Sequence, residues 1–303
     1  MEKVKYLNLP NCYRLSNGTV ELIVTTDVGP RIIRFAFIGG DNILGEYPDP
    51  SIKTELGVWK LYGGHRLWAA PEATPRTYAP DSSPIEYQIE GKETIRLIQR
   101  ADPKTGLEKE MTVTLSAEGS RVRVHHRLTN RNLWEIQLAP WAVTIFRLGL
   151  TILPQEPYRS HDQALLPARP LVLWHYTDLG DSRFRIGKKF FLVKPNEAIH
   201  EPQKIGIANK QEWAAYWKNK TLFIKRSEYK EGASYPDYGS SMEVYTESAF
   251  MEIETLAPLQ KLEPNQSAEH VETWALFNNV EIPEEEMYLE KALLPFLEKS
   301  ATK

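Results

Sequence analysis

Residues 107–128 read Leu107-Glu-Lys-Glu-Met-Thr-Val-Thr-Leu115, then Ser116-Ala-Glu-Gly-Ser120, then Arg121-Val-Arg-Val-His-His-Arg-Leu128. In the first and last of these runs, apolar and polar residues alternate with a period of two. That period is typical of a strand with one buried and one solvated face. The glycine-containing segment between the runs is typical of a turn. The stretch therefore predicts two neighbouring strands of an antiparallel sheet.

The same pattern extends outward from this stretch toward both ends of the chain. Strand-like runs separated by Gly, Pro or Asn turns occupy residues 4–37, 85–99, 136–146, 171–225, 242–255 and 270–277. No linker separates the two halves, so we expect one domain over residues 1–303, built of stacked or continuous antiparallel sheets. Residues 283–300 differ, because they form an amphipathic helical pattern that is expected to cover a sheet edge. The sequence predicts an all-β protein with a C-terminal helix.

The composition limits the classes of function. With 303 residues and 42% hydrophobic content the chain can bury a large core, and its net charge of −3 provides no basic field for nucleic acid or an acidic membrane. No apolar run approaches the roughly 18 residues of a membrane span, and no secretory segment is found, so a cytoplasmic protein is expected. The single cysteine, Cys12, excludes an internal disulfide and a thiolate cluster for zinc or iron–sulfur. We expect a small neutral ligand, no metal and no cofactor.

One segment has the composition of a binding site: Tyr62-Gly-Gly-His-Arg-Leu-Trp-Ala-Ala-Pro-Glu72. The paired glycines allow close approach of the backbone to a bulky group. His65 can transfer protons near neutral pH, Arg66 offers a planar set of donors, and Trp68 offers a flat apolar face. The alternative is an ordinary turn between strands, with His65 and Arg66 solvated and Trp68 packed inward.

Other candidates lie before and after this segment. Arg31 is placed at the mouth of a strand, where it either reaches a ligand or is solvated, and Trp141 follows a proline that would turn its indole sideways. Glu252 and Glu254 are two residues apart and so share one face of a strand. They either lie in solvent or line a site, and where water is scarce each raises the pKa of the other.

Two separated parts of the chain resemble the galactose mutarotase-like superfamily, which includes the aldose 1-epimerases. The later part comprises Met242-Glu-Val-Tyr-Thr246, Met251-Glu-Ile-Glu-Thr255, Leu262-Glu-Pro-Asn-Gln266 and Glu272-Thr-Trp-Ala-Leu-Phe277, and the earlier part comprises Asp27-Val-Gly-Pro-Arg31 and Gly63-Gly64. The sequence departs from the family at two places. Tyr62 stands where the family has a histidine before its Gly-Gly pair, and Trp141 stands where it has a second histidine.

The resemblance implies an antiparallel β-supersandwich that binds an aldose in a concave aromatic cleft and interconverts its anomers by acid/base catalysis. By this resemblance Glu254 takes the place of the general base, and His65 is the nearby substitute for the acid. The residues expected to bind the sugar are Tyr62, Arg66, Trp68, Glu72, Arg31, Trp141, Tyr235, Glu243 and Glu252. Such a reaction needs neither metal nor nucleotide, and the protein is expected as a monomer or homodimer.

Two other functions stay open on the sequence. The first is a non-catalytic protein that binds or senses a carbohydrate and has lost the acid. The second is a polysaccharide lyase or glycoside hydrolase, because related sandwiches serve such enzymes. A lyase would require a basic cleft. A hydrolase would require the carboxyl groups of Glu243 and Glu254 to lie roughly 5 to 9.5 Å apart.

Overall fold

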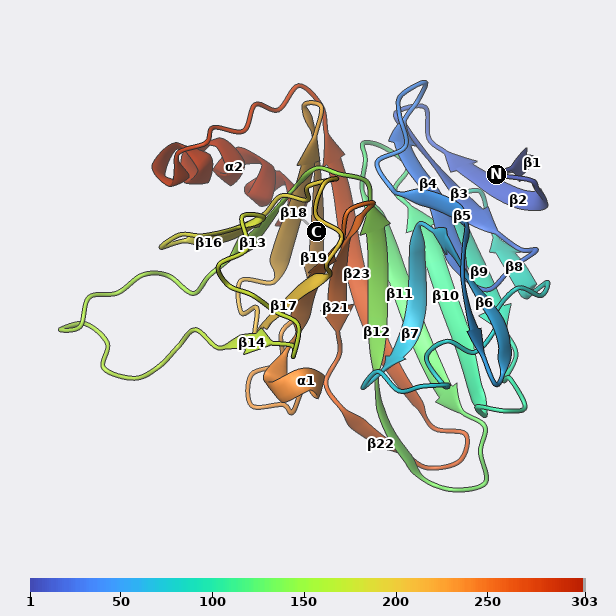
Figure 1. Cartoon of the computed structure of the whole chain (residues 1–303). Helices are drawn as coiled ribbons and strands as arrows, with labels where there is room; N and C mark the ends of the chain where they lie inside the picture. The colour runs from blue at the N-terminus through green and yellow to red at the C-terminus, as the bar shows by residue number, and fades with distance from the viewer. Residues whose placement is uncertain (302–303) are drawn as a thin grey trace.

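A computed structural model describes residues 1–301 of the chain, and it consists mainly of two large antiparallel sheets (Figure 1). The first sheet has the strand order β1 (Glu2–Tyr6), β2 (Leu9–Ser16), β3 (Val20–Thr25), β4 (Arg31–Phe37), β7 (His65–Ala70), β12 (Ile136–Phe146), β21 (Met251–Leu256), β20 (Met242–Thr246), β17 (Gln203–Ile207) and β14 (Leu171–Leu173), with β22 (Gln260–Leu262) paired to β12. The central strands β7, β12 and β21 therefore come from three distant parts of the sequence.

The second sheet contains the two strands from which the sequence prediction started. Its order is β15 (Phe184–Ile186), β16 (Phe190–Val193), β13 (Leu150–Pro154), β18 (Trp213–Lys218), β19 (Thr221–Ser227), β23 (Ser267–Phe277), β11 (Val122–Asn130), β10 (Leu107–Leu115), β9 (Thr94–Gln99) and β8 (Glu86–Glu90). β10 and β11 pair antiparallel, with Met111 opposite His126. The predicted all-β antiparallel sandwich is confirmed.

A hairpin, β5 (Glu46–Thr54) and β6 (Gly57–Gly63), forms a small third sheet outside the first one. Trp59 and Leu61 of this hairpin pack with Trp68, Trp141 and Val143 of the first sheet. The opposite face of the first sheet packs on the second sheet through an apolar layer that includes Leu67, Ile253 and Phe223. The central strands of the first sheet are consequently covered on both faces, which explains why β7 and β21 are buried along their whole length.

Helices are few. The short α1 (Pro236–Gly239) precedes β20, and α2 (Glu286–Ala301) lies near the C-terminus. Leu289 and Leu293 of α2 pack against Ile152, Trp213 and Ile224, so the helix covers the outer face of the second sheet and not an edge as predicted (Figure 1). Within residues 1–301 no helix combines the length and the apolar character that crossing a membrane requires.

The paired glycines of the sequence prediction form the sharp turn from β6 into β7. Gly63 and Gly64 have φ values of +91° and +69°. A Cβ at position 63 would lie 2.1 Å from the carbonyl oxygen of Gly45, and a Cβ at position 64 would lie 2.2 Å from that of Ile32. The two positions therefore require glycine for backbone reasons. The turn fixes which residues of β7 face outward.

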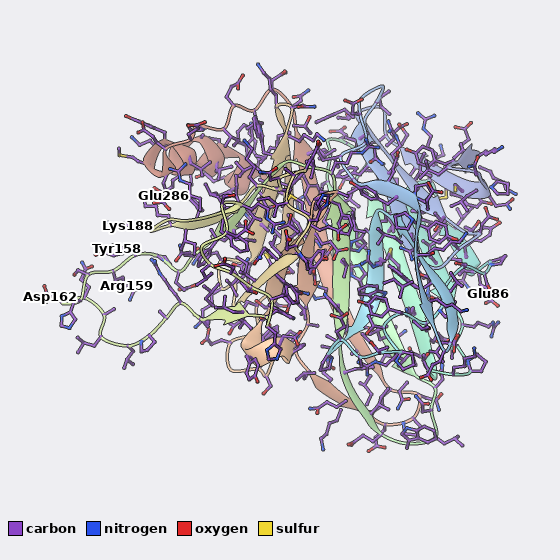
Figure 2. The ribbon with its side chains drawn as sticks, in the orientation of Figure 1. Glu86, Tyr158, Arg159, Asp162, Lys188 and Glu286 are labelled. Atoms are coloured by element: carbon purple, nitrogen blue, oxygen red, sulfur yellow. The ribbon has the colours of Figure 1, made fainter. Side chains whose placement is uncertain are left out.

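A long connection between β13 and β14 projects from the body of the molecule. Figure 2 shows Tyr158, Arg159 and Asp162 on this loop. Tyr158 lies near Lys188 in the β15–β16 turn, with 5.3 Å between Lys188 Nζ and the ring centre, and Asp162 lies farther out. The loop lies far from the central strands β7, β12 and β21, where the polar side chains of the next section converge (Figure 1).

Candidate functional site

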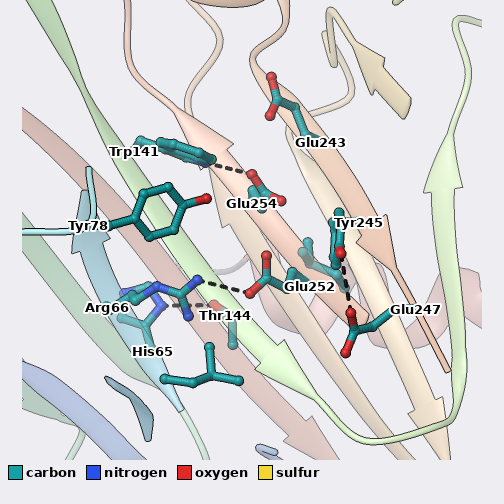
Figure 3. Close-up of polar contacts among 12 residues, drawn as sticks. His65, Arg66, Tyr78, Trp141, Thr144, Glu243, Tyr245, Glu247, Glu252 and Glu254 are labelled. Atoms are coloured by element: carbon teal, nitrogen blue, oxygen red, sulfur yellow. Dashed lines mark hydrogen bonds and ion pairs between the residues drawn. The ribbon is translucent and has the colours of Figure 1, made fainter. Parts of the chain in front are cut away.

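A cavity of about 310 Å³ opens on the outer face of the first sheet, beneath the β5–β6 hairpin. Its wall combines aromatic rings with charged side chains from strands that are distant in sequence (Figure 3). The lining residues are Pro50, Ser51, Ile52, Trp59, Leu61, Arg66, Trp68, Glu72, Tyr78, Trp141, Tyr176, Lys204, Tyr245, Glu247, Phe250, Glu252 and Glu254. Concave sites with many apolar groups and a few convergent polar ones are typical of small-molecule binding.

The alternation of the strands explains how the carboxylates come together. Successive residues of a strand point to opposite faces, so Glu252 and Glu254 of β21 both face the cavity while Ile253 packs between the sheets. β20 pairs with β21 so that Glu243 is opposite Glu254 and Tyr245 is opposite Glu252. Four polar side chains thus lie on one small area of sheet.

Only one of the two carboxylate oxygens of Glu254 has hydrogen-bond partners among residues 1–301. Its Oε2 accepts hydrogen bonds from Trp141 Nε1 at 2.6 Å and from Lys204 Nζ at 2.8 Å. No residue of the described chain bonds to its Oε1, although the side chain is 1% exposed. The carboxylate is therefore fixed in orientation and keeps one free acceptor oxygen.

Glu252 pairs with a guanidinium that two indoles hold in place. Arg66 Nη2 donates to Glu252 Oε1 at 2.9 Å, and the guanidinium lies 4.0 Å from the ring centre of Trp68 and 5.4 Å from that of Trp59. Burial raises the pKa of Glu252 to about 7, with Arg66 lowering it and the charge of Glu254 raising it further. Nε and Nη1 of Arg66 are buried without a partner among residues 1–301.

Lys204 is a central residue of the site that sequence reasoning missed. Its Nζ lies 2.7 Å from Glu243 Oε2 and 2.8 Å from Glu254 Oε2, and it sits 4.8 Å from the ring centres of both Trp141 and Trp174. Burial opposes the charged ammonium, but the two carboxylates outweigh it and raise the pKa of Lys204 well above its ordinary value. The available signal was a lysine in an otherwise apolar predicted strand, where a buried charge needs partners.

Aromatic side chains complete the wall. Trp68 is the centre of this group, with ring-centre distances of 5.4 Å to Trp59, 5.1 Å to Trp141 and 5.4 Å to Tyr78. Tyr78 comes from the loop after β7, and its hydroxyl donates to Glu72. The lining residues that the sequence prediction did not include are Pro50, Ser51, Ile52, Trp59, Leu61, Tyr78, Tyr176, Lys204, Tyr245, Glu247 and Phe250. Most of them come from the hairpin and loops, whose position relative to the sheet no strand pattern encodes.

His65 lies on the other face of β7 and does not line the cavity. Its imidazole is completely buried between the two sheets, and its Nδ1 lies 2.8 Å from Thr144 Oγ1 (Figure 3). Its Nε2 lies 2.7 Å from His126 Nε2. Burial lowers the pKa of His65 well below its ordinary value. The predicted pairing of His65 with Glu254 in one site is therefore corrected, because Arg66 occupies the face that points into the cavity.

Four of the predicted binding residues also lie outside the cavity. Arg31 is fully buried, donates to Asp81 Oδ2 at 2.7 Å and lies 5.2 Å from the ring centre of Tyr62. The Tyr62 hydroxyl donates to Ser82 at 3.2 Å. Tyr235 stacks on Tyr229 at 5.1 Å. The fourth is Glu243, which does not line the cavity but lies 2.7 Å from Lys204 Nζ. The structure brings the other predicted residues together at the cavity wall: Arg66, Trp68, Glu72, Trp141, Glu252 and Glu254.

The polar layer between the sheets offers the one close group of three possible metal ligands among residues 1–301: His65, His126 and Glu272. Hydrogen bonds already engage their ligand atoms. His126 Nδ1 faces a backbone carbonyl at 3.2 Å and so carries a hydrogen, which leaves its Nε2 to accept from His65. Glu272 Oε1 lies 2.8 Å from Lys225 Nζ, and its Oε2 accepts from Trp274 at 2.8 Å. This set of donors and acceptors is consistent with a structural network.

Comparison with solved structures identifies the fold. The chain is similar to a galactose mutarotase-like protein from Lactobacillus casei (10% identity, 88% of this chain and 100% of that chain, TM-score 0.56) and to a protein provisionally described as an aldose 1-epimerase from Escherichia coli K12 (12%, 88% and 99%, TM-score 0.52). It is also similar to part of a TPR-domain containing protein from Parabacteroides distasonis (13%, 91% and 49%, TM-score 0.59). No protein-family model matches the sequence, and comparison with curated proteins gives no match. The chain adopts the fold of the galactose mutarotase-like superfamily.

Proposed function

We propose that the protein binds an aldose in the cavity beneath the β5–β6 hairpin and interconverts its anomers. The observation that carries this proposal is a set of buried polar atoms without partners in an aromatic cavity. Glu254 Oε1 offers an acceptor, while Arg66 Nη1 and Nε and Trp59 Nε1 offer donors, and no residue of the described chain satisfies them. Leaving such an atom unpaired costs about 1–3 kcal/mol, so a ligand that carries hydroxyl groups would remove that cost.

The aromatic wall of the cavity suits the apolar faces of a sugar ring. A pyranose presents apolar C–H faces as well as hydroxyls, and the indoles of Trp68 and Trp141 offer flat apolar surfaces beside the charged groups. Their rings lie at the same register position of β7 and β12. A ligand placed on them would have Glu254 within the same cavity.

The reaction requires only two proton transfers and a rotation. A base removes the proton from the C1 hydroxyl while an acid protonates the ring oxygen, so that the ring opens, and reclosure after rotation gives the other anomer. Glu254 is our candidate for the base, because its Oε1 is free while Oε2 is held by Trp141 and Lys204.

Sugar binding without catalysis is the second candidate. The position of His65 favours it, because the imidazole expected to supply the acid lies between the sheets and outside the cavity. A protein that kept the aromatic cavity and lost the acid would bind sugars and leave the anomer ratio unchanged.

Polarimetry separates these two candidates. Freshly dissolved α-anomers of several aldoses are mixed with the wild-type protein, with Glu254→Gln and with Glu118→Gln, a change at an exposed turn residue. We expect the wild type and Glu118→Gln to accelerate the change in rotation equally, and Glu254→Gln to lose roughly 10²–10⁴-fold, the usual contribution of general acid–base catalysis. Sugar affinity in calorimetry without acceleration by the wild type would establish the second candidate, and equal rates for all three proteins would remove Glu254 from the chemistry.

A further inference from the structure

We infer that Glu252 is the proton donor to the ring oxygen, the role for which the sequence had suggested His65; this inference rests on the proposed anomer exchange. Glu252 and Glu254 would then form a carboxyl pair in which one group donates a proton and the other accepts one. Both side chains line the cavity, and both belong to β21.

The geometry of the strand supports the pairing. Residues two apart on a strand face the same way and lie about 6.6 Å apart along the chain, at roughly 3.3 Å per residue. A single pyranose ring laid along β21 spans a comparable distance. The two oxygens that exchange protons, O1 and the ring oxygen, are both bonded to C1, so the carboxyls need to reach neighbouring atoms of one ligand.

The hydrogen bonds of Glu252 leave its carboxyl group able to donate a proton to a ligand. Arg66 Nη2 binds Oε1 at 2.9 Å, and no described residue hydrogen-bonds to Oε2. Burial raises the pKa of this carboxyl to about 7, so a substantial fraction carries a proton at neutral pH. When the proton leaves, Arg66 stabilises the resulting carboxylate, and Trp68 and Trp59 hold the guanidinium in place.

Glu254 has the complementary surroundings. Two donors, Trp141 Nε1 and Lys204 Nζ, bind its Oε2 and so stabilise negative charge on it. Two carboxyl groups in one site whose environments differ in this way are the usual basis for separate acid and base roles.

Other donors in the cavity fit the role less well. Lys204 is held by Glu243 and Glu254, which raise its pKa well above the ordinary value and oppose proton release. The Tyr78 hydroxyl already donates to Glu72, and burial raises its pKa as well. Glu252 therefore remains the best-placed acid.

The protons and electrons balance over the cycle. Glu254 Oε1 takes the proton of the C1 hydroxyl, the C1–O1 bond becomes a carbonyl, and the electron pair of the broken bond from C1 to the ring oxygen stays on that oxygen. The ring oxygen receives the proton of Glu252, whose carboxylate stays paired with Arg66. After rotation about C1–C2, both transfers run in reverse, and each carboxyl returns to its starting state.

Two variants test the inference, with Glu118→Gln as the control. Glu252→Gln keeps an oxygen for Arg66 and loses the proton, so we expect the exchange rate at saturation to fall roughly 10²–10⁴-fold while sugar affinity in calorimetry stays within a few-fold. Glu252→Ala opens space for a small external acid, and added formate buffer is expected to restore exchange in proportion to the concentration of formic acid. A residue needed only for structure would show no such rescue.

The outcomes distinguish the two proposals. Loss in Glu252→Gln together with rescue of Glu252→Ala supports Glu252 as the acid. Full activity of Glu252→Gln, or absence of rescue, overturns that role and leaves the anomer exchange of the wild type standing. Absence of exchange by the wild type on every aldose tested overturns the proposed function, and this inference with it.

Discussion

Lys204 supplies the sharpest test of the cavity's electrostatics, because one ammonium group serves two carboxylates. Lys204→Met keeps the length of the side chain and removes the charge. Glu243 and Glu254 are then left buried without the counter-charge that lies 2.7 Å and 2.8 Å away in the wild type. Removal of one partner from a buried ion pair typically costs about 3–5 kcal/mol.

Protonation of Glu243 limits that cost. Burial already raises the pKa of Glu243 well above its ordinary value although Lys204 lowers it, so the variant can bury this carboxyl in its neutral form. We therefore expect a loss of about 3 kcal/mol in the free energy of unfolding at pH 7, at the lower end of that range. A carboxyl whose pKa is raised in the folded state stabilises the fold at low pH and loses this contribution as pH rises through the folded pKa. The deficit of Lys204→Met should accordingly shrink between pH 7 and pH 5.

Urea unfolding at pH 5, 6 and 7 measures these differences. Lys210→Met is the matched control, because Lys210 is paired with Glu231 on the surface at 2.8 Å and its loss should leave the unfolding midpoint unchanged. The double variant Lys204→Met with Glu243→Gln should recover part of the stability, since it removes one of the two buried charges. If Lys204→Met is as stable as the wild type at pH 7, or if its deficit grows toward pH 5, the description of this cluster is wrong.

Three further predictions follow from the cavity and the turn beside it. Wild-type kcat/KM should fall above about pH 7, since Glu252 must carry its proton and burial raises its pKa to about 7, whereas a pH profile without that decline would exclude Glu252 as the acid. Trp141→Phe keeps the ring and removes the 2.6 Å hydrogen bond to Glu254, so polarimetry should show an exchange rate reduced about tenfold, for a contribution of about 1.5 kcal/mol; an unchanged rate would contradict this. Gly64→Ala should lower the free energy of unfolding by more than Gly91→Ala does. Gly91 has a similar φ of +75° but open space around it, so its substitution costs only the backbone strain of about 1–2 kcal/mol. Equal losses for the two variants would show that the contact of the Gly64 position with Ile32 relaxes freely.

The sequence predicts the β architecture well because that architecture follows from a local pattern. Period-two alternation in β10 and β11 gives both strands and their antiparallel pairing, and the same alternation correctly places Glu252 and Glu254 on one face of β21. The position of α2 is harder to predict. An amphipathic helix only needs an apolar surface, and the outer face of the second sheet provides one.

The site is only partly predictable for a different reason. Alternation shows that His65 and Arg66 face opposite ways, but it does not show which of the two faces the cavity, because both faces of β7 are buried. Arg31 and Tyr62 depend on contacts with Asp81 and Ser82, which belong to a loop whose path no periodicity encodes. Lys204 comes from a strand distant in the sequence, and only the pairing of β17 with β20 brings it beside Glu243 and Glu254.

The turn at Gly63-Gly64 also sets the register of everything that follows in β7. A deletion or insertion of one residue there would rotate the whole strand by half a turn and exchange the groups on its two sides. The guanidinium of Arg66 would then meet the ammonium of Lys225 in the polar layer, and Glu252 would lose its only ion-pair partner within residues 1–301. The length of this one turn therefore decides whether the cavity receives the guanidinium of Arg66 or the imidazole of His65.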